Sequence, residues 1–171
     1  MTVLVTYASR YGGTVGIAER IAETLTLAGV ETETRPVDDV ADVARYRAVV
    51  LGSAVYFGSW LKAATTFVAE NETLLGDRPV WLFSSGPLPG AVLPEGQDDD
   101  PTPKGIGDIL AAIHPREHRV FDGALDPGRL NLRDRMIRAL PAGRPLLPEV
   151  DGRDWPAIAT WAAGIARALE A

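Results

Sequence analysis

The chain has 171 residues, of which 46% are hydrophobic and 23% charged, as is typical of a globular protein and unlike a disordered chain. Cysteine is absent, which excludes disulfide scaffolds, iron–sulfur clusters and thiol nucleophiles, and two histidines are too few for a His-rich metal site. The net charge of −6, with scattered basic residues, argues against a nucleic-acid partner. We therefore expect one domain over residues 1–171, without a metal or a nucleic acid.

Neither a membrane span nor a signal peptide is indicated by the sequence. No apolar run approaches the roughly 18 residues of a spanning helix. Residues 1–5 begin directly in a strand pattern. We therefore expect a cytoplasmic protein.

Short apolar runs alternate with segments of helical periodicity along the chain. Strands are predicted over residues 3–7, 31–37, 48–52, 79–83 and 118–121. Helices are predicted over 17–28, from a cap at Ser59, over 106–113 and 130–140, and from a cap at Asp154 to the end. Apolar strands separated by helices predict an α/β protein, with a doubly wound parallel sheet covered on both faces.

Ligands of such sheets bind outside the carboxyl ends of the strands. This rule selects three loops, at residues 8–14, 53–59 and 84–104. The third loop includes an acidic run at 98–100, which we expect to be solvated.

The first loop has the composition of a phosphate-binding turn. It runs through Ser9, Arg10, Tyr11, Gly12, Gly13 and Thr14 into a helix. The hydroxyls of Ser9 and Thr14 can donate hydrogen bonds, the glycines permit close approach, and the helix N-terminus favours an anion. Arg10 could compensate its charge. The alternative is a plain glycine turn in which Ser9 or Thr14 caps the helix.

The dinucleotide, Walker A and G-x-S-x-G motifs are absent. Instead, residues 5–9 followed by Gly12, Thr14, Ala18 and Ile21 resemble the flavodoxin signature for the phosphate of FMN. Thr6 departs from that pattern, at a strand position where an apolar residue is usual. The resemblance implies FMN as cofactor and a flavodoxin-like three-layer sandwich with five parallel strands in the order 2-1-3-4-5.

The resemblance also implies that the other two loops hold the flavin ring. They supply Ala54, Val55, Tyr56, Phe57 and Gly58 after the third strand, and Ser84, Ser85 and Gly86 after the fourth. Tyr56 or Phe57 could stack on the ring, unless both simply pack on the helix below. The third loop lacks the stacking tyrosine of flavodoxins, which predicts an open second face.

A second resemblance covers most of the chain. The first loop, residues 134–138 followed by Gly143, and residues 152–155 look like the menaquinone-dependent protoporphyrinogen IX dehydrogenases. This resemblance implies an FMN enzyme that passes electrons to a quinone. It also implies an additional segment before the last helix, where this chain has residues 122–145.

The segment 122–145 concentrates positive charge in an acidic protein. It contains Arg129, Arg133, Arg135, Arg138 and Arg144 together with Leu130, Leu132, Met136, Ile137 and Leu140. A basic amphipathic helix could hold a propionate-bearing tetrapyrrole or rest peripherally on an anionic membrane. The alternative is an ordinary helix that covers the sheet.

The sequence therefore predicts an FMN-dependent oxidoreductase, with protoporphyrinogen IX as the hypothetical substrate and a quinone as the acceptor. Because the flavin itself accepts electrons, we nominate no catalytic side chain and interpret His114 and His118 as structural. Two alternatives stay open. One is a small electron carrier that docks on a redox-protein partner, and the other is a flavin-free interaction module with the same fold.

Overall fold

The computed structural model describes residues 1–90 and 101–171, so the acidic run at 98–100 lies outside the described part. The strands are β1 (Val3–Ala8), β2 (Thr32–Pro36), β3 (Ala48–Tyr56), β4 (Ser59–Trp60), β5 (Val80–Ser85), β6 (Glu117–Phe121), β7 (Ala124–Leu125) and β8 (Val150–Asp151). The helices are α1 (Gly13–Leu27), α2 (Lys62–Glu70), α3 (Glu72–Gly76), α4 (Ile106–Ile113), α5 (Leu132–Ala139) and α6 (Trp155–Glu170).

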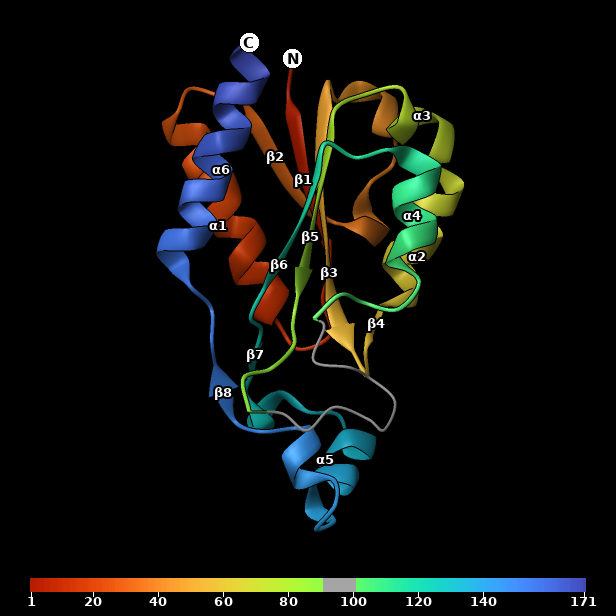
Figure 1. The fold of residues 1–171 in the computed structure, drawn as a ribbon, viewed down its shortest axis with the longest axis vertical. Helices are drawn as coiled ribbons and strands as arrows, with labels where there is room; N and C mark the ends of the chain where they lie inside the picture. Colours follow the sequence, from red (N-terminus) through yellow and green to blue (C-terminus); the bar gives the residue numbers. More distant parts are fainter. Residues whose placement is uncertain (91–100) are drawn as a thin grey trace.

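Five strands form a parallel sheet in the order β2-β1-β3-β5-β6. Among the parallel strands this is the order 2-1-3-4-5, so the predicted fold is confirmed. Figure 1 shows α1 and α6 on one face of the sheet and α2, α3 and α4 on the other. Both termini lie at one end of the molecule, and the carboxyl ends of the strands point to the opposite end.

Each face of the sheet buries its own core, because successive side chains of a strand point to opposite faces. In β1, Val5 faces α1 and α6, whereas Leu4 faces the side of α2 and α4. Gly52 of β3 pairs with Phe83 of β5, and the Phe83 ring fills the space that a side chain at Gly52 would need. Phe83 can therefore pack edge-on against Trp161 of α6, with ring centroids 6.3 Å apart.

Thr6 of β1 is the residue that departs from the flavodoxin pattern. It is fully buried, and its Oγ1 has no hydrogen-bond partner among the residues that the structure describes. A buried hydroxyl without a partner costs about 1–3 kcal/mol. Thr6 therefore weakens the sheet in which it lies.

The prediction that Ser59 caps a helix is wrong. Phe57 and Gly58 have positive φ angles of 48° and 82° and form a two-residue turn between β3 and the antiparallel strand β4. Positive φ at both positions marks a type I′ turn, whose twist matches the flanking strands. The helix α2 begins only after Leu61. The turn is not predicted from the sequence because phenylalanine seldom adopts a left-handed conformation.

Residues 122–151, here called the appended segment, lie beyond the carboxyl ends of the strands. They comprise β7 and β8, which pair antiparallel, and α5, which Figure 1 shows below the sheet and away from the termini. The idea that the helix predicted at 130–140 covers the sheet is therefore wrong. The segment instead buries Leu125, Leu130 and Leu147 in a small cluster of its own.

Candidate functional site

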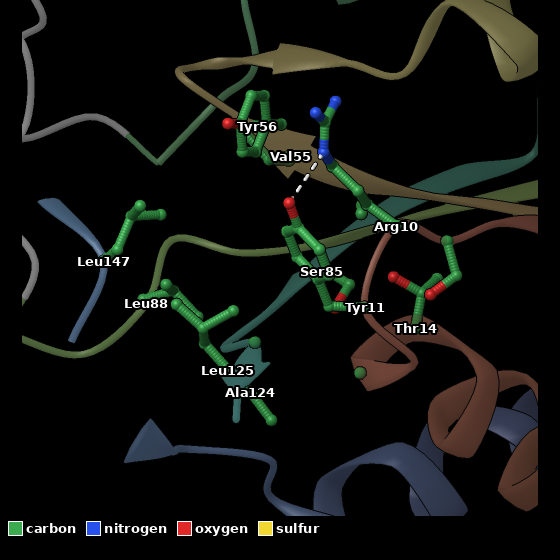
Figure 2. Close-up of a pocket in the computed structure, with 14 residues that line it drawn as sticks. Arg10, Tyr11, Thr14, Val55, Tyr56, Ser85, Leu88, Ala124, Leu125 and Leu147 are labelled. Atoms are coloured by element: carbon green, nitrogen blue, oxygen red, sulfur yellow. Dashed lines mark hydrogen bonds between the residues drawn. The ribbon is translucent and has the colours of Figure 1, made fainter. Parts of the chain in front are cut away.

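The loops after β1, β3 and β5 converge on one cavity at the end of the sheet. It is lined by Ser9, Arg10, Tyr11, Gly13, Thr14, Ala54, Val55, Tyr56, Ser85, Leu88, Gly123, Ala124, Leu125 and Leu147. Every lining residue from Ser9 to Ser85 belongs to the set that the sequence predicts for cofactor binding. The remaining lining residues are Leu88, which follows β5, and four residues of the appended segment, of which Figure 2 labels Ala124, Leu125 and Leu147.

The loop at 9–14 is organised by its own hydrogen bonds and keeps donors available. Gly12 has φ of 88°, and its N–H donates to Ser9 Oγ at 3.0 Å. Ser9 accepts this bond, so its hydroxyl hydrogen remains a donor. No side chain in the described residues caps α1, so its first amides keep their hydrogen-bonding capacity. With Thr14 lining the cavity from the first turn of α1, these donors form a set that suits a phosphate.

The glycines of this loop also accommodate the appended segment. A side chain on Gly13 would come within 2.7 Å of the Ala124 carbonyl oxygen, and one on Gly12 would meet the Arg129 guanidinium. Arg153 Nη1 donates to the Gly13 carbonyl oxygen at 3.3 Å. The loop is thus packed against the appended segment as well as facing the cavity.

The remaining predicted site residues do not line the cavity: they are Gly12, Phe57, Gly58, Ser84 and Gly86. Phe57 is 44% exposed at the tip of the β3–β4 turn. Gly86 donates its N–H to the Phe121 carbonyl oxygen at 2.8 Å and so bridges the ends of β5 and β6. These two positions therefore belong to the framework around the cavity.

Ser84 is fully buried and takes part in an internal chain of hydrogen bonds. Trp60 Nε1 donates to Ser84 Oγ at 2.8 Å, and Ser84 Oγ lies 2.8 Å from His118 Nε2. Burial lowers the pKa of His118, which favours a neutral imidazole that accepts the Ser84 proton. This arrangement agrees with the interpretation of His118 as structural.

Asp134 is the polar side chain with the most hydrogen-bond partners at the site, and it was not among the predicted site residues. It is fully buried on α5, and no other charged residue in the described part of the chain is buried. Tyr56 Oη donates to Asp134 Oδ1 at 2.6 Å, and Tyr11 Oη donates to Oδ2. Arg10 Nε lies 3.5 Å from Oδ2. One carboxylate thus joins α5 to both the first and the second predicted loop.

This cluster sets the protonation of its members. Burial alone would raise the pKa of Asp134, but the hydrogen bonds from Tyr11 and Tyr56 and the charge of Arg10 outweigh burial and lower it. Burial and the neighbouring carboxylate raise the pKa of Tyr56. The Arg10 guanidinium lies over the Tyr56 ring, 4.2 Å from its centroid, and donates to Tyr11 Oη, as Figure 2 shows. The charge that was expected to compensate a phosphate is thus used within this cluster.

Aliphatic side chains line one side of the cavity. Leu88, Leu125 and Leu147 close the side opposite Arg10 and Thr14 (Figure 2), and the remaining cavity is about 60 Å³. Pockets for ligands of this size usually measure ~300–1,000 Å³. The donor set therefore fits the phosphate of FMN, whereas this cavity between the described residues is smaller than the flavin ring needs. For the ring to enter this cavity, the leucine side chains that line it would have to move.

Two other expectations concern metals and membranes. Within residues 1–90 and 101–171, His, Asp and Glu side chains form no group of three or more that could hold a metal ion. Across the same two ranges, no helix combines the length and apolar character needed to cross a bilayer.

Comparisons with known proteins agree with the fold described above. A structure of a flavodoxin from the domain Archaea aligns over 100% of both chains with a TM-score of 0.63 and 16% identity. The oxidised flavodoxin 1 from Bacillus cereus aligns over 98% of both chains with a TM-score of 0.62 and 14% identity. The rubredoxin oxygen:oxidoreductase of Desulfovibrio gigas aligns over 99% of this chain but only 36% of its own, with a TM-score of 0.63 and 14% identity.

At these identities the solved structures establish the fold alone. A search of curated protein sequences found no match. The family model for the flavodoxin domain matches residues 4–141, which is most of the chain and includes the three loops of the cavity. The chain therefore belongs to the flavodoxin domain family.

Proposed function

We propose that this protein is an FMN-binding oxidoreductase whose phosphate site is the loop at 9–14 and whose 171 residues act as one binding domain. The observation that carries the proposal is the convergence of that loop with residues 54–56 and Ser85 on one cavity at the carboxyl ends of the strands. Such edges are where doubly wound sheets bind ligands.

The chain's own residues would bind and orient the cofactor. Ser9, Thr14 and the first amides of α1 would hold the phosphate, while Ala54, Val55, Tyr56 and Ser85 would face the ring. FMN supplies reversible electron transfer when it is bound. The leucines of the appended segment would then exclude water from the ring.

The substrate and the acceptor are the finer part of the proposal. Protoporphyrinogen IX and a quinone are suggested by the resemblance alone, and the Arg129 guanidinium beside Gly12 supports a substrate with acidic groups. A flavodoxin-type electron carrier is the alternative, favoured by the acidic character of the chain as a whole. If the FMN-loaded protein oxidises protoporphyrinogen IX with a quinone as acceptor, the protein is an enzyme and not an electron carrier.

A flavin-free interaction module is the second candidate function. The cavity of about 60 Å³, closed by leucine side chains, is the observation that favours it. In this case the Tyr11–Asp134–Tyr56 cluster would be a permanent part of the fold.

Titration with FMN and with riboflavin, followed by absorbance and by quenching of flavin fluorescence, tests the proposal. Because riboflavin lacks the phosphate, FMN should bind at least about tenfold more tightly, which corresponds to ~1.4 kcal/mol. Thr14→Val should weaken FMN binding and leave riboflavin binding unchanged. Thr24→Val, on the outer part of α1, is the matched control. If neither the wild type nor Asp134→Asn retains FMN, the proposal fails and the flavin-free module is favoured.

A further inference from the structure

We propose that the outer face of α5 is a docking surface for an anionic lipid bilayer. Asp134 and Ile137 form the inner side of this helix, in contact with the tyrosines and with the leucine cluster. At about 100° per residue, Leu132 and Met136 lie on the other side, and Leu140 follows directly after the helix. These three side chains are 76%, 64% and 61% exposed. A helix of a globular protein ordinarily turns such a stripe toward the core, whereas α5 presents it outward.

Positive charge surrounds this stripe. Between residues 127 and 146 the charged residues are Arg129, Arg133, Arg135, Arg138, Arg144 and the buried Asp134. Helical spacing places Arg133 on one flank of the stripe and Arg135 on the other. The positive charge is therefore concentrated around α5, whereas over the whole appended segment Asp122, Asp126, Asp134, Glu149 and Asp151 balance the five arginines.

A hollow of about 500 Å³ lies next to the stripe. Its walls include Leu130 and Leu140 together with Arg135, Arg138 and Arg144. Guanidinium groups bind phosphate oxygens in a planar, two-point geometry, and the leucines offer an apolar neighbour. The combination suits the headgroup phosphate of a lipid with the start of its acyl chains.

Within the described ranges, four of the six large exposed apolar side chains come from the end of the molecule that carries α5, whereas Met1 and Leu27 lie at the other end. The six are Met1, Leu27, Phe57, Leu132, Met136 and Leu140. Phe57 lies on the β3–β4 turn, which Figure 1 places at the same end as α5, and its neighbour Tyr56 is bonded to Asp134. A bilayer accommodates both features at once, because apolar side chains enter the acyl boundary while arginines remain at the headgroups. We favour the lipid because arginines flank an exposed apolar stripe on one short helix, which is the arrangement of helices that lie in the membrane interface.

Docking in this way would place the cavity directly above the bilayer, since Asp134 on the inner side of α5 contacts Tyr11 and Tyr56 at the cavity. The reason for such docking, electron transfer to a lipid-soluble acceptor, rests on the proposed function. The test of docking needs no flavin.

Co-sedimentation with vesicles tests the proposal, using the full chain with and without added FMN. We expect binding to vesicles of equal parts phosphatidylcholine and phosphatidylglycerol that is at least about tenfold stronger than binding to phosphatidylcholine alone, and that weakens with added salt. The double variant Leu132→Ser with Met136→Ser should lose most of this binding. Leu27→Ser, at a residue 83% exposed on α1, is the matched control and should bind as the wild type does.

A second pair of variants tests the charge. Arg133→Gln with Arg144→Gln should weaken binding to the anionic vesicles, whereas Arg45→Gln on the opposite part of the molecule should not. Circular dichroism confirms that each variant is folded.

Three results would overturn the inference. The wild type could fail to bind anionic vesicles, or the Leu27 control could lose as much binding as the stripe variant. Binding that needs the arginines but survives loss of the stripe would indicate electrostatic adsorption to the headgroups and not an inserted surface. Because vesicle binding is measured without flavin, failure of FMN binding would leave these results unaffected, and the two proposals fail separately.

Discussion

The sandwich and the appended segment are held in place by different forces. In the sandwich, both faces of the sheet bury continuous apolar clusters that draw on nearly every element. The appended segment buries only Leu125, Leu130 and Leu147 and is anchored to the cavity loops through Asp134. Stability in the sandwich is therefore distributed over many contacts, whereas the appended segment is held by a small leucine cluster packed against Tyr11, Tyr56 and Leu88 and by the hydrogen bonds to Asp134.

The largest expected effect concerns the sandwich. Phe83→Ala should lower the free energy of unfolding by about 4 kcal/mol, because it removes a fully buried ring between Gly52 and Trp161. Chemical denaturation followed by circular dichroism measures the loss. Phe57→Ala, at an exposed phenylalanine, should change it by no more than about 0.5 kcal/mol. If both variants lose a similar free energy of unfolding, the stability of the protein does not come mainly from the core beneath the sheet.

Asp134→Ala should produce the next largest effect, and a local one. It leaves two tyrosine hydroxyls and the Arg10 guanidinium without their acceptor, at a cost of about 3 kcal/mol to attachment of the segment. Hydrogen exchange should show that residues 124–151 lose protection while β1, β3 and β5 keep it. Asp122→Ala, at an exposed position, serves as the control. Uniform loss of protection over the whole chain would show that the two regions do not separate.

Acidification should loosen the segment through the same carboxylate. The pKa of Asp134 is lowered in the folded protein, so on acidification the unfolded chain takes up its proton first, and protonation favours the unfolded state. The stabilisation is complete at neutral pH and is lost progressively below about pH 5. Denaturation midpoints of Asp134→Asn should therefore fall less steeply over that range than those of the wild type. Asp122→Asn, at an exposed position, is the control, and its curve should stay close to that of the wild type.

The smallest effect is a gain in the sandwich. Thr6→Val keeps the shape of the side chain and removes a buried hydroxyl without a partner, so it should raise the free energy of unfolding by about 1 kcal/mol. Thr34→Val, at an exposed position of β2, separates this effect from a general preference of strands for valine. An equal gain in both variants would mean that the orphaned hydroxyl is not the cause.

The sequence predicted those parts of the molecule whose signals are local. Apolar runs and helical periodicity placed the parallel strands, and the first loop stood out by its hydroxyls and glycines. The β3–β4 turn was missed because its left-handed position holds Phe57, and turn signals rest on Asn, Asp and Gly. Asp134 was missed because its partners Tyr11 and Tyr56 lie far away in the chain, and no spacing rule connects them.

Gly13 illustrates how a motif can have two independent causes. Its lack of a side chain permits the approach of the Ala124 carbonyl oxygen and, in the site that we propose, would also permit the approach of an anion. A bulkier residue at this position would therefore disturb both the attachment of the appended segment and the binding of a ligand. The effect of such a variant could not be assigned to one cause. Mutational dissection of the loop should accordingly use Thr14, whose side chain faces the cavity, and should treat the glycines as shared architecture.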